Sequence, residues 1–182
     1  MNEMLSAHGL ETKFAAIDRS AVSASDIGGY ASVFGEADQN GDIVEPGAFA
    51  ASLKRLAAEG RSVKLLWQHD PAKPIGVWED VSEDTAGLRV RGRLLTDLAQ
   101  GAEAATLLAA GAIDGLSIGY RTVRAEKAGK GRRLIELDLW EVSLVTFPML
   151  PSARASAKAP DPEAELAQAL SDALKGAREA LA

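Results

Sequence analysis

The feature that most constrains the fold of this chain is the alternation of apolar and polar residues in several short segments. Residues 88–95 show it clearly, because apolar positions alternate there with Arg89, Arg91 and Arg93. A period of two is typical of strands that bury one face. We predict strands over residues 29–34, 63–69, 75–79, 88–95, 116–123, 133–138 and 139–147.

Two segments between these strands have the spacing of amphipathic helices. The first starts near Pro46, a residue that suits the first turn of a helix, and ends at Gly60. The second runs from a cap at Thr96 to Gly111. The chain is therefore predicted to be an α+β protein with many strands and two internal helices.

The length and composition fit one compact domain with an arm and a tail. The chain has 182 residues, of which 47% are hydrophobic, and this is enough for one closed core. We expect residues 1–26 to form an irregular arm and residues 27–150 to form the domain. Prolines punctuate the segment that follows, so residues 151–182 are predicted to form a linker and a short amphipathic helix.

The residues that carry chemistry are few, which limits the possible reactions. The sequence contains no cysteine, and this excludes thiol nucleophiles, disulfides and cysteine-ligated zinc. Its two histidines are His8 and His69, too few for a histidine-rich metal site. We expect neither a metal nor another cofactor.

The overall charge disfavours two classes of partner. The net charge is −6, whereas phosphate backbones and anionic membrane surfaces attract clusters of Lys and Arg. The longest apolar runs are also far shorter than the ~20 residues that span a bilayer. We therefore expect no nucleic-acid partner and no membrane partner.

Ser117 is the candidate nucleophile. It lies in the segment Gly115-Leu-Ser117-Ile-Gly119, which matches the G-x-S-x-G pattern of serines exposed at a tight turn. A serine between two glycines is more often a simple turn or barrel-corner residue, so the match matters only if a base accompanies it. In α/β-hydrolases the histidine follows the serine, whereas no histidine follows Ser117. An ester hydrolase of that kind ranks below a hydrolase in which the histidine comes first.

His69 is the candidate base. It shares the alternating face of Val63 and Trp67 in a predicted strand, where a neutral imidazole could accept a proton. The alternative is a structural histidine that bonds the turn that follows it. His8 is the poorer choice because it lies in the predicted arm.

Glu141 is the candidate third member, which would orient the imidazole. Its face of residues 137–147 is apolar apart from this glutamate and one serine, and a carboxylate buried there needs a partner. The imidazolium of His69 would be such a partner. Asp138 and Asp114 are the alternatives, although Asp138 falls on the opposite face and Asp114 suits the preceding turn.

Several linked blocks occur in order between residues 27 and 153. They are Gly29-Tyr-Ala-Ser-Val-Phe34, Pro46-Gly-Ala-Phe49, Leu66-Trp-Gln-His-Asp70, Pro74-Ile-Gly76, Asp114-Gly-Leu-Ser-Ile-Gly-Tyr120 and Leu139-Trp-Glu-Val-Ser-Leu-Val-Thr-Phe-Pro148. Together these blocks resemble the prohead proteases of HK97-type tailed phages. The resemblance implies a serine endopeptidase with a mostly antiparallel β-barrel flanked by helices, related in fold to herpesvirus assemblins.

The resemblance also implies roles for particular residues. In that family the histidine of the Trp-Gln-His-Asp block and the serine of the Gly-Leu-Ser block are the catalytic pair, which correspond here to His69 and Ser117. Assemblins use a second histidine as the third member, and residues 27–150 contain none besides His69. Glu141 is therefore expected in that role.

A place and a substrate are implied as well. The resemblance implies work inside the immature capsid, or prohead, in the host cytoplasm. There the protease would cleave the scaffolding segment of the major capsid protein and then remove its own tail. Assembly of the chain into a homo-oligomer is a further option. The alternative from a different class is a non-catalytic capsid assembly or scaffold module, which the amphipathic tail and the acidic charge favour.

Overall fold

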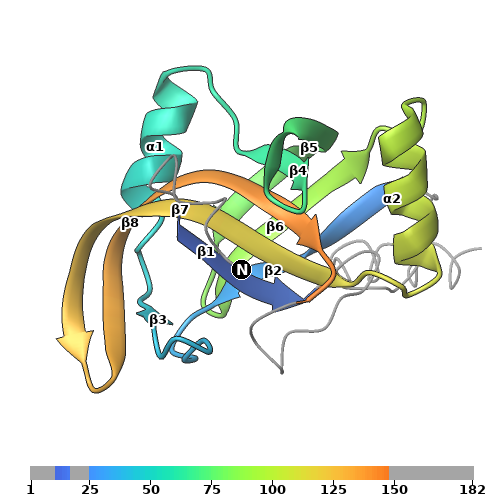
Figure 1. The fold of residues 1–182 in the computed structure, drawn as a ribbon. Helices are drawn as coiled ribbons and strands as arrows, with labels where there is room; N and C mark the ends of the chain where they lie inside the picture. Colours follow the sequence, from blue (N-terminus) through green and yellow to red (C-terminus); the bar gives the residue numbers. More distant parts are fainter. Residues whose placement is uncertain (1–10, 17–24, 148–182) are drawn as a thin grey trace, which may run out of the picture.

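The structure is a computed structural model that describes residues 11–16 and 25–147, which form a strand-rich fold with two helices (Figure 1). In the sheet the strands follow the order β1-β7-β8-β4-β5-β6-β2, and β3 pairs with β8 off this path. The strands are β1 (Glu11–Ala16), β2 (Asp26–Val33), β3 (Ile43–Val44), β4 (Lys64–Trp67), β5 (Asp70–Glu83), β6 (Gly87–Leu94), β7 (Gly115–Ala128) and β8 (Gly131–Val145).

The alternation seen in the sequence explains most of these strands. In β6, Leu88 and Val90 are fully buried, whereas Arg91 and Arg93 are exposed, as expected for a sheet with one buried face. Several strands are longer than predicted, β5 and β7 most clearly. β5 begins at Asp70 and not at residue 75, and the segments predicted as two strands, 133–138 and 139–147, lie mainly in the single strand β8.

The sheet is mixed, so the expected mostly antiparallel barrel is confirmed only in part, as a curled strand-rich sheet with two helices. β8 runs parallel to both β3 and β4, while the other pairings among the described strands are antiparallel. The sheet curls until β1 and β2 contact each other, but no pairing between these two edges closes it within the described residues (Figure 1). Alternation within a segment does not specify strand direction, because a parallel neighbour depends on a crossover elsewhere in the chain.

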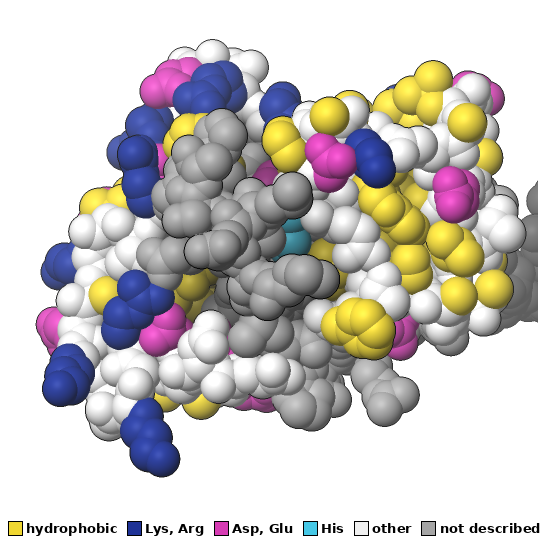
Figure 2. Space-filling view, in the orientation of Figure 1, with side chains coloured by type: hydrophobic (Ala, Val, Ile, Leu, Met, Phe, Trp, Pro, Cys, Tyr) yellow, Lys and Arg dark blue, Asp and Glu magenta, His cyan; other side chains and the backbone are white. Residues whose placement is uncertain are grey.

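The two helices lie within their predicted segments. Helix α1 (Ala50–Ala58) packs against β8 and β5, and helix α2 (Ala99–Ala109) packs against β5 and β6. They stand at opposite ends of the curled sheet (Figure 1). Figure 2 shows that Lys and Arg side chains gather over α1 and the free end of the β7–β8 hairpin, whereas hydrophobic side chains gather over α2.

The N-terminal arm contains a strand that the sequence pattern did not reveal. Residues 11–16, which were expected to be irregular, form β1 and pair antiparallel with residues 115–120 of β7. Most of the predicted arm, residues 1–10 and 17–24, and the predicted tail at 151–182 lie outside the described residues. The division into arm, domain and tail therefore stays a prediction. No helix of the described part is long and apolar enough to cross a membrane.

Candidate active site

Three neighbouring strands bring together the segments that carry the predicted site. In the antiparallel pair β7–β8, Ser117 lies opposite Ser143 and Gly119 lies opposite Glu141. On the other side of β8, parallel strand β4 aligns its residues 64–67 with residues 141–144. Side chains directly opposite each other on antiparallel strands share a face of the sheet, so Ser117 and Ser143 point to the same side.

His69 reaches this place through a turn, which corrects the expectation that it lies on a strand face. β4 ends at Trp67, and Gln68 and His69 then adopt left-handed backbone conformations with φ of 52° and 62°. The backbone N–H of Gln68 donates to the carbonyl of Leu144 at 3.0 Å, which ties the turn to β8. Two register shifts in the pairing of β4 with β5 precede the turn. These irregularities end the alternation before it reaches His69.

The imidazole of His69 contacts the carboxylate of Glu141. Nδ1 lies 2.6 Å from Oε1, and the two side chains are only 9% and 7% exposed. An ionised carboxylate can only accept, so Nδ1 carries the proton and the neutral ring accepts protons at Nε2. This is the tautomer that a general base for a serine requires.

Glu141 has a second hydrogen-bonding partner, which accounts for its burial. The hydroxyl of Ser143 donates to Oε2 at 2.5 Å, so both carboxylate oxygens are engaged. The backbone N–H of His69 donates to the same Ser143 oxygen at 3.1 Å. A buried carboxylate is tolerated when its oxygens are hydrogen-bonded. The need for a partner, as predicted for this apolar face, is met by His69 and Ser143.

Ser117 lies within strand β7 and is fully buried. Its Oγ forms no hydrogen bond with the described residues. The G-x-S-x-G segment is thus extended strand, whereas the motif suggested an exposed serine at a tight turn. Ser117 and His69 are linked through Ser143, which is opposite the first and hydrogen-bonded to the second.

The second glycine of that motif has a spatial role. A Cβ atom at Gly119 would lie only 1.9 Å from Oε1 of Glu141 and 2.8 Å from its Cγ. The glutamate side chain therefore extends across β7 in space that only glycine leaves free. The sequence match alone did not distinguish this close approach from a turn.

The other acidic candidates are placed elsewhere. The carboxylate of Asp138 binds Arg121 of β7 at 3.0 Å and Arg55 of α1. Partial burial opposes ionisation of Asp138, but these arginines outweigh it and hold its pKa below the ordinary value. Asp114 is partly exposed just before β7. His8 lies outside the described residues.

Ser143 is the site residue that sequence reasoning missed. The available signal was its spacing of two from Glu141, which puts both residues on one face of a strand. The described residues contain no group of three or more His, Cys, Asp or Glu side chains that could hold a metal ion.

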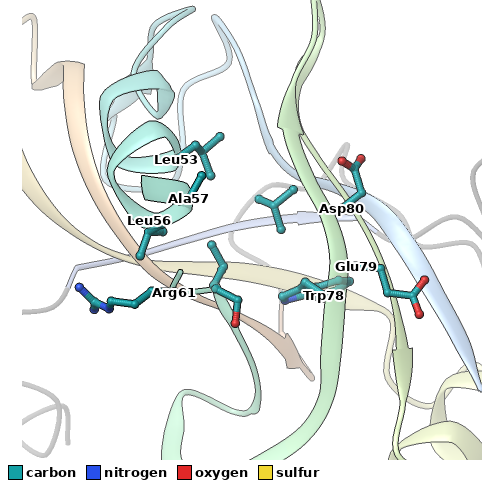
Figure 3. A pocket seen from close by; sticks show the side chains of 10 residues that line it. Leu53, Leu56, Ala57, Arg61, Trp78, Glu79 and Asp80 are labelled. Atoms are coloured by element: carbon teal, nitrogen blue, oxygen red, sulfur yellow. The ribbon is translucent and has the colours of Figure 1, made fainter. Parts of the chain in front are cut away.

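A groove of about 300 Å³ between α1 and β5 is a separate feature (Figure 3). Leu53, Leu56 and Ala57 point from the helix toward the side of β5 that carries Trp78 (Figure 3). The indole N–H of Trp78 donates to the carbonyl of Val142 at 3.2 Å. The groove includes none of the three candidate site residues. Its lining residues are Leu53, Leu56, Ala57, Arg61, Ser62, Val63, Trp78, Glu79, Asp80 and Val81.

A serine, a histidine and a carboxylate on adjoining parts of a curled sheet define the class of a candidate serine hydrolase. The chain belongs to the Caudovirus prohead serine protease family, whose model matches residues 12–166. This confirms the family resemblance seen in the sequence blocks.

Two known proteins are similar to this chain. The prohead protease of Enterobacteria phage HK97 is 35% identical over 124 residues, which are 66% of this chain and 54% of that protein. The chain thus spans about half the length of this curated relative. The structure of the capsid assembly protease of bacteriophage T4 matches with a TM-score of 0.61 over 76% of this chain and 98% of that one, at 16% identity. At that identity the likeness establishes the fold alone.

Proposed function

We propose that this chain is a serine endopeptidase that cleaves the scaffolding segment of the major capsid protein during prohead maturation. The observation that carries the proposal is the 2.6 Å contact between Nδ1 of His69 and Glu141, at the place where β7 presents Ser117. Membership of the prohead protease family and the names of the similar phage proteins support the choice of substrate.

The proposed mechanism is acyl transfer through the three side chains. Ser117 Oγ attacks the scissile carbonyl while Nε2 of His69 takes its proton, and an acyl-enzyme forms. His69 then gives the proton to the leaving amine, and water releases the acyl group. Glu141 holds the ring in the required tautomer and stabilises the imidazolium that forms.

We also propose a relation in fold to herpesvirus assemblins. The curled strand-rich sheet and the order histidine before serine support it. The third member differs, because Glu141 occupies the place beside Nδ1 of His69 where assemblins have a second histidine.

The same site is proposed to act on the chain itself, inside the prohead. The sequence pattern, with prolines at positions 148, 151 and 160, predicts a linker there, and an extended segment can enter a protease site as a strand. Purified wild-type chain should therefore shorten at residues 148–160 in intact-mass measurements, and the Ser117→Ala chain should not. A wild-type chain that stays full length while it cuts capsid protein would refute the self-cleavage.

The decisive experiment is co-expression of the Ser117→Ala chain with its capsid protein, read by mass spectrometry. We expect wild type to shorten the capsid protein and Ser117→Ala to leave it intact. Ser32→Ala is the matched control, because Ser32 is also fully buried and its Oγ likewise forms no hydrogen bond with the described residues. Shortening by Ser117→Ala would eliminate the proposed nucleophile. Normal shells without any cleavage by wild type would favour the assembly module.

A further inference from the structure

The hydroxyl of Ser143 connects the two residues that activate Ser117 in the proposed mechanism. It accepts the backbone N–H of His69 at 3.1 Å and donates its own proton to Oε2 of Glu141 at 2.5 Å. Ser143 is fully buried, so water does not compete for these bonds. One side chain therefore contacts both the candidate base and the candidate acid.

Each bond restrains a different degree of freedom. A left-handed conformation is unfavourable for a residue with a side chain, and His69 adopts it with φ of 62°. The hydrogen bond from its backbone N–H to Ser143 stabilises this conformation and so fixes the backbone position from which the imidazole extends. The bond to Oε2 fixes the plane of the Glu141 carboxylate, while Oε1 contacts the ring.

The same bonds separate the roles of the two facing serines. The proton of Ser143 is engaged by a carboxylate, and its oxygen already accepts an N–H, so this hydroxyl is poorly suited to attack a carbonyl. Ser117, directly opposite, has no hydrogen bond with the described residues. The geometry thus leaves Ser117 as the nucleophile of the pair.

We propose that Ser143 is a positioning residue of this site, an inference that rests on the proposed function. It acts through His69 and Glu141 and does not touch the substrate. Loss of its hydroxyl should let the ring and the carboxylate drift from the geometry that proton transfer needs. Displacements of about 1 Å can lower catalytic rates by 10²-fold.

The test compares Ser143→Ala, Ser143→Thr and Ser32→Ala in the full chain. The first readout is the rate at which diisopropyl fluorophosphate modifies Ser117, measured across the pH range in which imidazole titrates. The second is cleavage of a capsid-derived peptide, with kcat and KM determined separately. The third is the low-field proton NMR signal of the His69 Nδ1–H in its bond to Glu141.

We expect Ser143→Ala to lower the modification rate and kcat by roughly 10- to 100-fold with little change in KM, and to shift or broaden the low-field signal. Ser143→Thr keeps a hydroxyl and should recover a large part of the rate, and Ser32→Ala should match wild type. Wild-type rates and an unchanged signal in Ser143→Ala would overturn the inference. So would an equal loss in Ser32→Ala, because that would indicate a general effect of removing a buried hydroxyl.

The design also separates this inference from the proposed function. If the wild-type chain neither reacts with the phosphorylating reagent nor cuts peptide, the proposed function fails. The NMR signal still tests the positioning role of Ser143. An unchanged signal in Ser143→Ala would refute the inference, and a shifted or broadened signal there, with an unchanged signal in Ser32→Ala, would support it.

Discussion

The two halves of the β7–β8 hairpin are stabilised by different interactions. The inner half pairs residues 115–120 with residues 139–145, and its apolar side chains, such as Leu116 and Leu144, are fully buried. The outer half pairs residues 121–128 with residues 131–138; its β7 strand is largely exposed, whereas its β8 strand still contributes Leu134 and Leu137 to the core. Its charged residues form ion pairs, for example Arg132 with Asp42 and Arg133 with Glu45.

The difference teaches where a polar group matters in this fold. Polar side chains in the inner half, namely Ser117, Glu141 and Ser143, are buried, and the two that are hydrogen-bonded contact each other or His69. A buried polar group that loses its partner carries the full cost of desolvation, whereas an exposed ion pair contributes about 0–1 kcal/mol. The same substitution should therefore have different effects in the two halves.

The largest difference in cleavage rate is expected between Glu141→Gln and Glu136→Gln. The two glutamates lie in the inner and outer halves of the same strand, β8. Loss of the negative charge beside Nδ1 of His69 should lower cleavage of a capsid-derived peptide by roughly 10³- to 10⁴-fold, because the imidazolium is no longer stabilised. Glu136→Gln should cleave at the wild-type rate. Similar rates for the two variants would remove Glu141 from the mechanism.

A core substitution should have the next largest effect, this time on stability. Leu144 is 0% exposed, and Leu144→Ala should lower the free energy of unfolding by about 2–5 kcal/mol by leaving a cavity. Val123 in the outer half is 55% exposed, and Val123→Ala should change it by no more than about 0.5 kcal/mol. Urea titration of both full chains measures the difference. Equal losses would show that exposed Val123 contributes as much to stability as buried Leu144 does.

Gly119→Ala in the inner half and Gly129→Ala in the turn that ends the outer half make the same chemical change. At Gly119 the new Cβ would displace the Glu141 carboxylate from His69 and lower cleavage by roughly 10²-fold. At Gly129, where φ is 58° and nothing lies within 4 Å, we expect a loss of about 1 kcal/mol in stability and unchanged cleavage. Full activity in Gly119→Ala would contradict the close approach of Glu141 to β7.

The smallest effect is expected for Asp138→Asn in the outer half. Because the folded-state pKa of Asp138 lies below its ordinary value of 3.8, its contribution is present above that pH and is lost as the pH falls through the folded-state pKa. Asp138→Asn should therefore lower the free energy of unfolding at neutral pH by at most about 1 kcal/mol. Urea titrations at neutral and strongly acidic pH should show the gap closing as the pH falls. If the difference in free energy of unfolding between wild type and Asp138→Asn widened in acid, the lowered pKa of Asp138 would be contradicted.

Sequence patterns predicted the elements whose stability is local. Both helices lie within the segments, 46–60 and 96–111, that a period of 3.6 predicted. The predicted cap at Thr96 is wrong, because the N-cap of α2 is Leu98 and neither described helix has a side-chain cap. The strands with strict alternation, such as β6, were also located. Ser117 was selected from the G-x-S-x-G pattern, and His69 and Glu141 were selected by elimination among few histidines and buried acids. The structure places His69 and Glu141 in contact.

The rest depends on neighbours distant in sequence. The left-handed turn at Gln68 and His69 is anchored by Leu144 and Ser143 of β8, which no local pattern around His69 reveals. The parallel direction of β4 against β8 depends on the intervening helix and on the rest of the sheet. Strand β1 exists beside β7 although residues 11–16 alone gave weak periodicity. Strand pairing also determines that the buried Ser117 shares a face of the sheet with Ser143.

The central position of β8 has a consequence for when activity can arise. His69 and Glu141 are 72 positions apart, and β8, the last described strand, lies between β7 and β4. Contacts between distant segments form late in folding because their loops must close first. A nascent chain that has reached β7 holds the histidine and the serine but lacks the strand between them. The proposed protease is therefore inert during its own synthesis and becomes competent only when the whole sheet is complete.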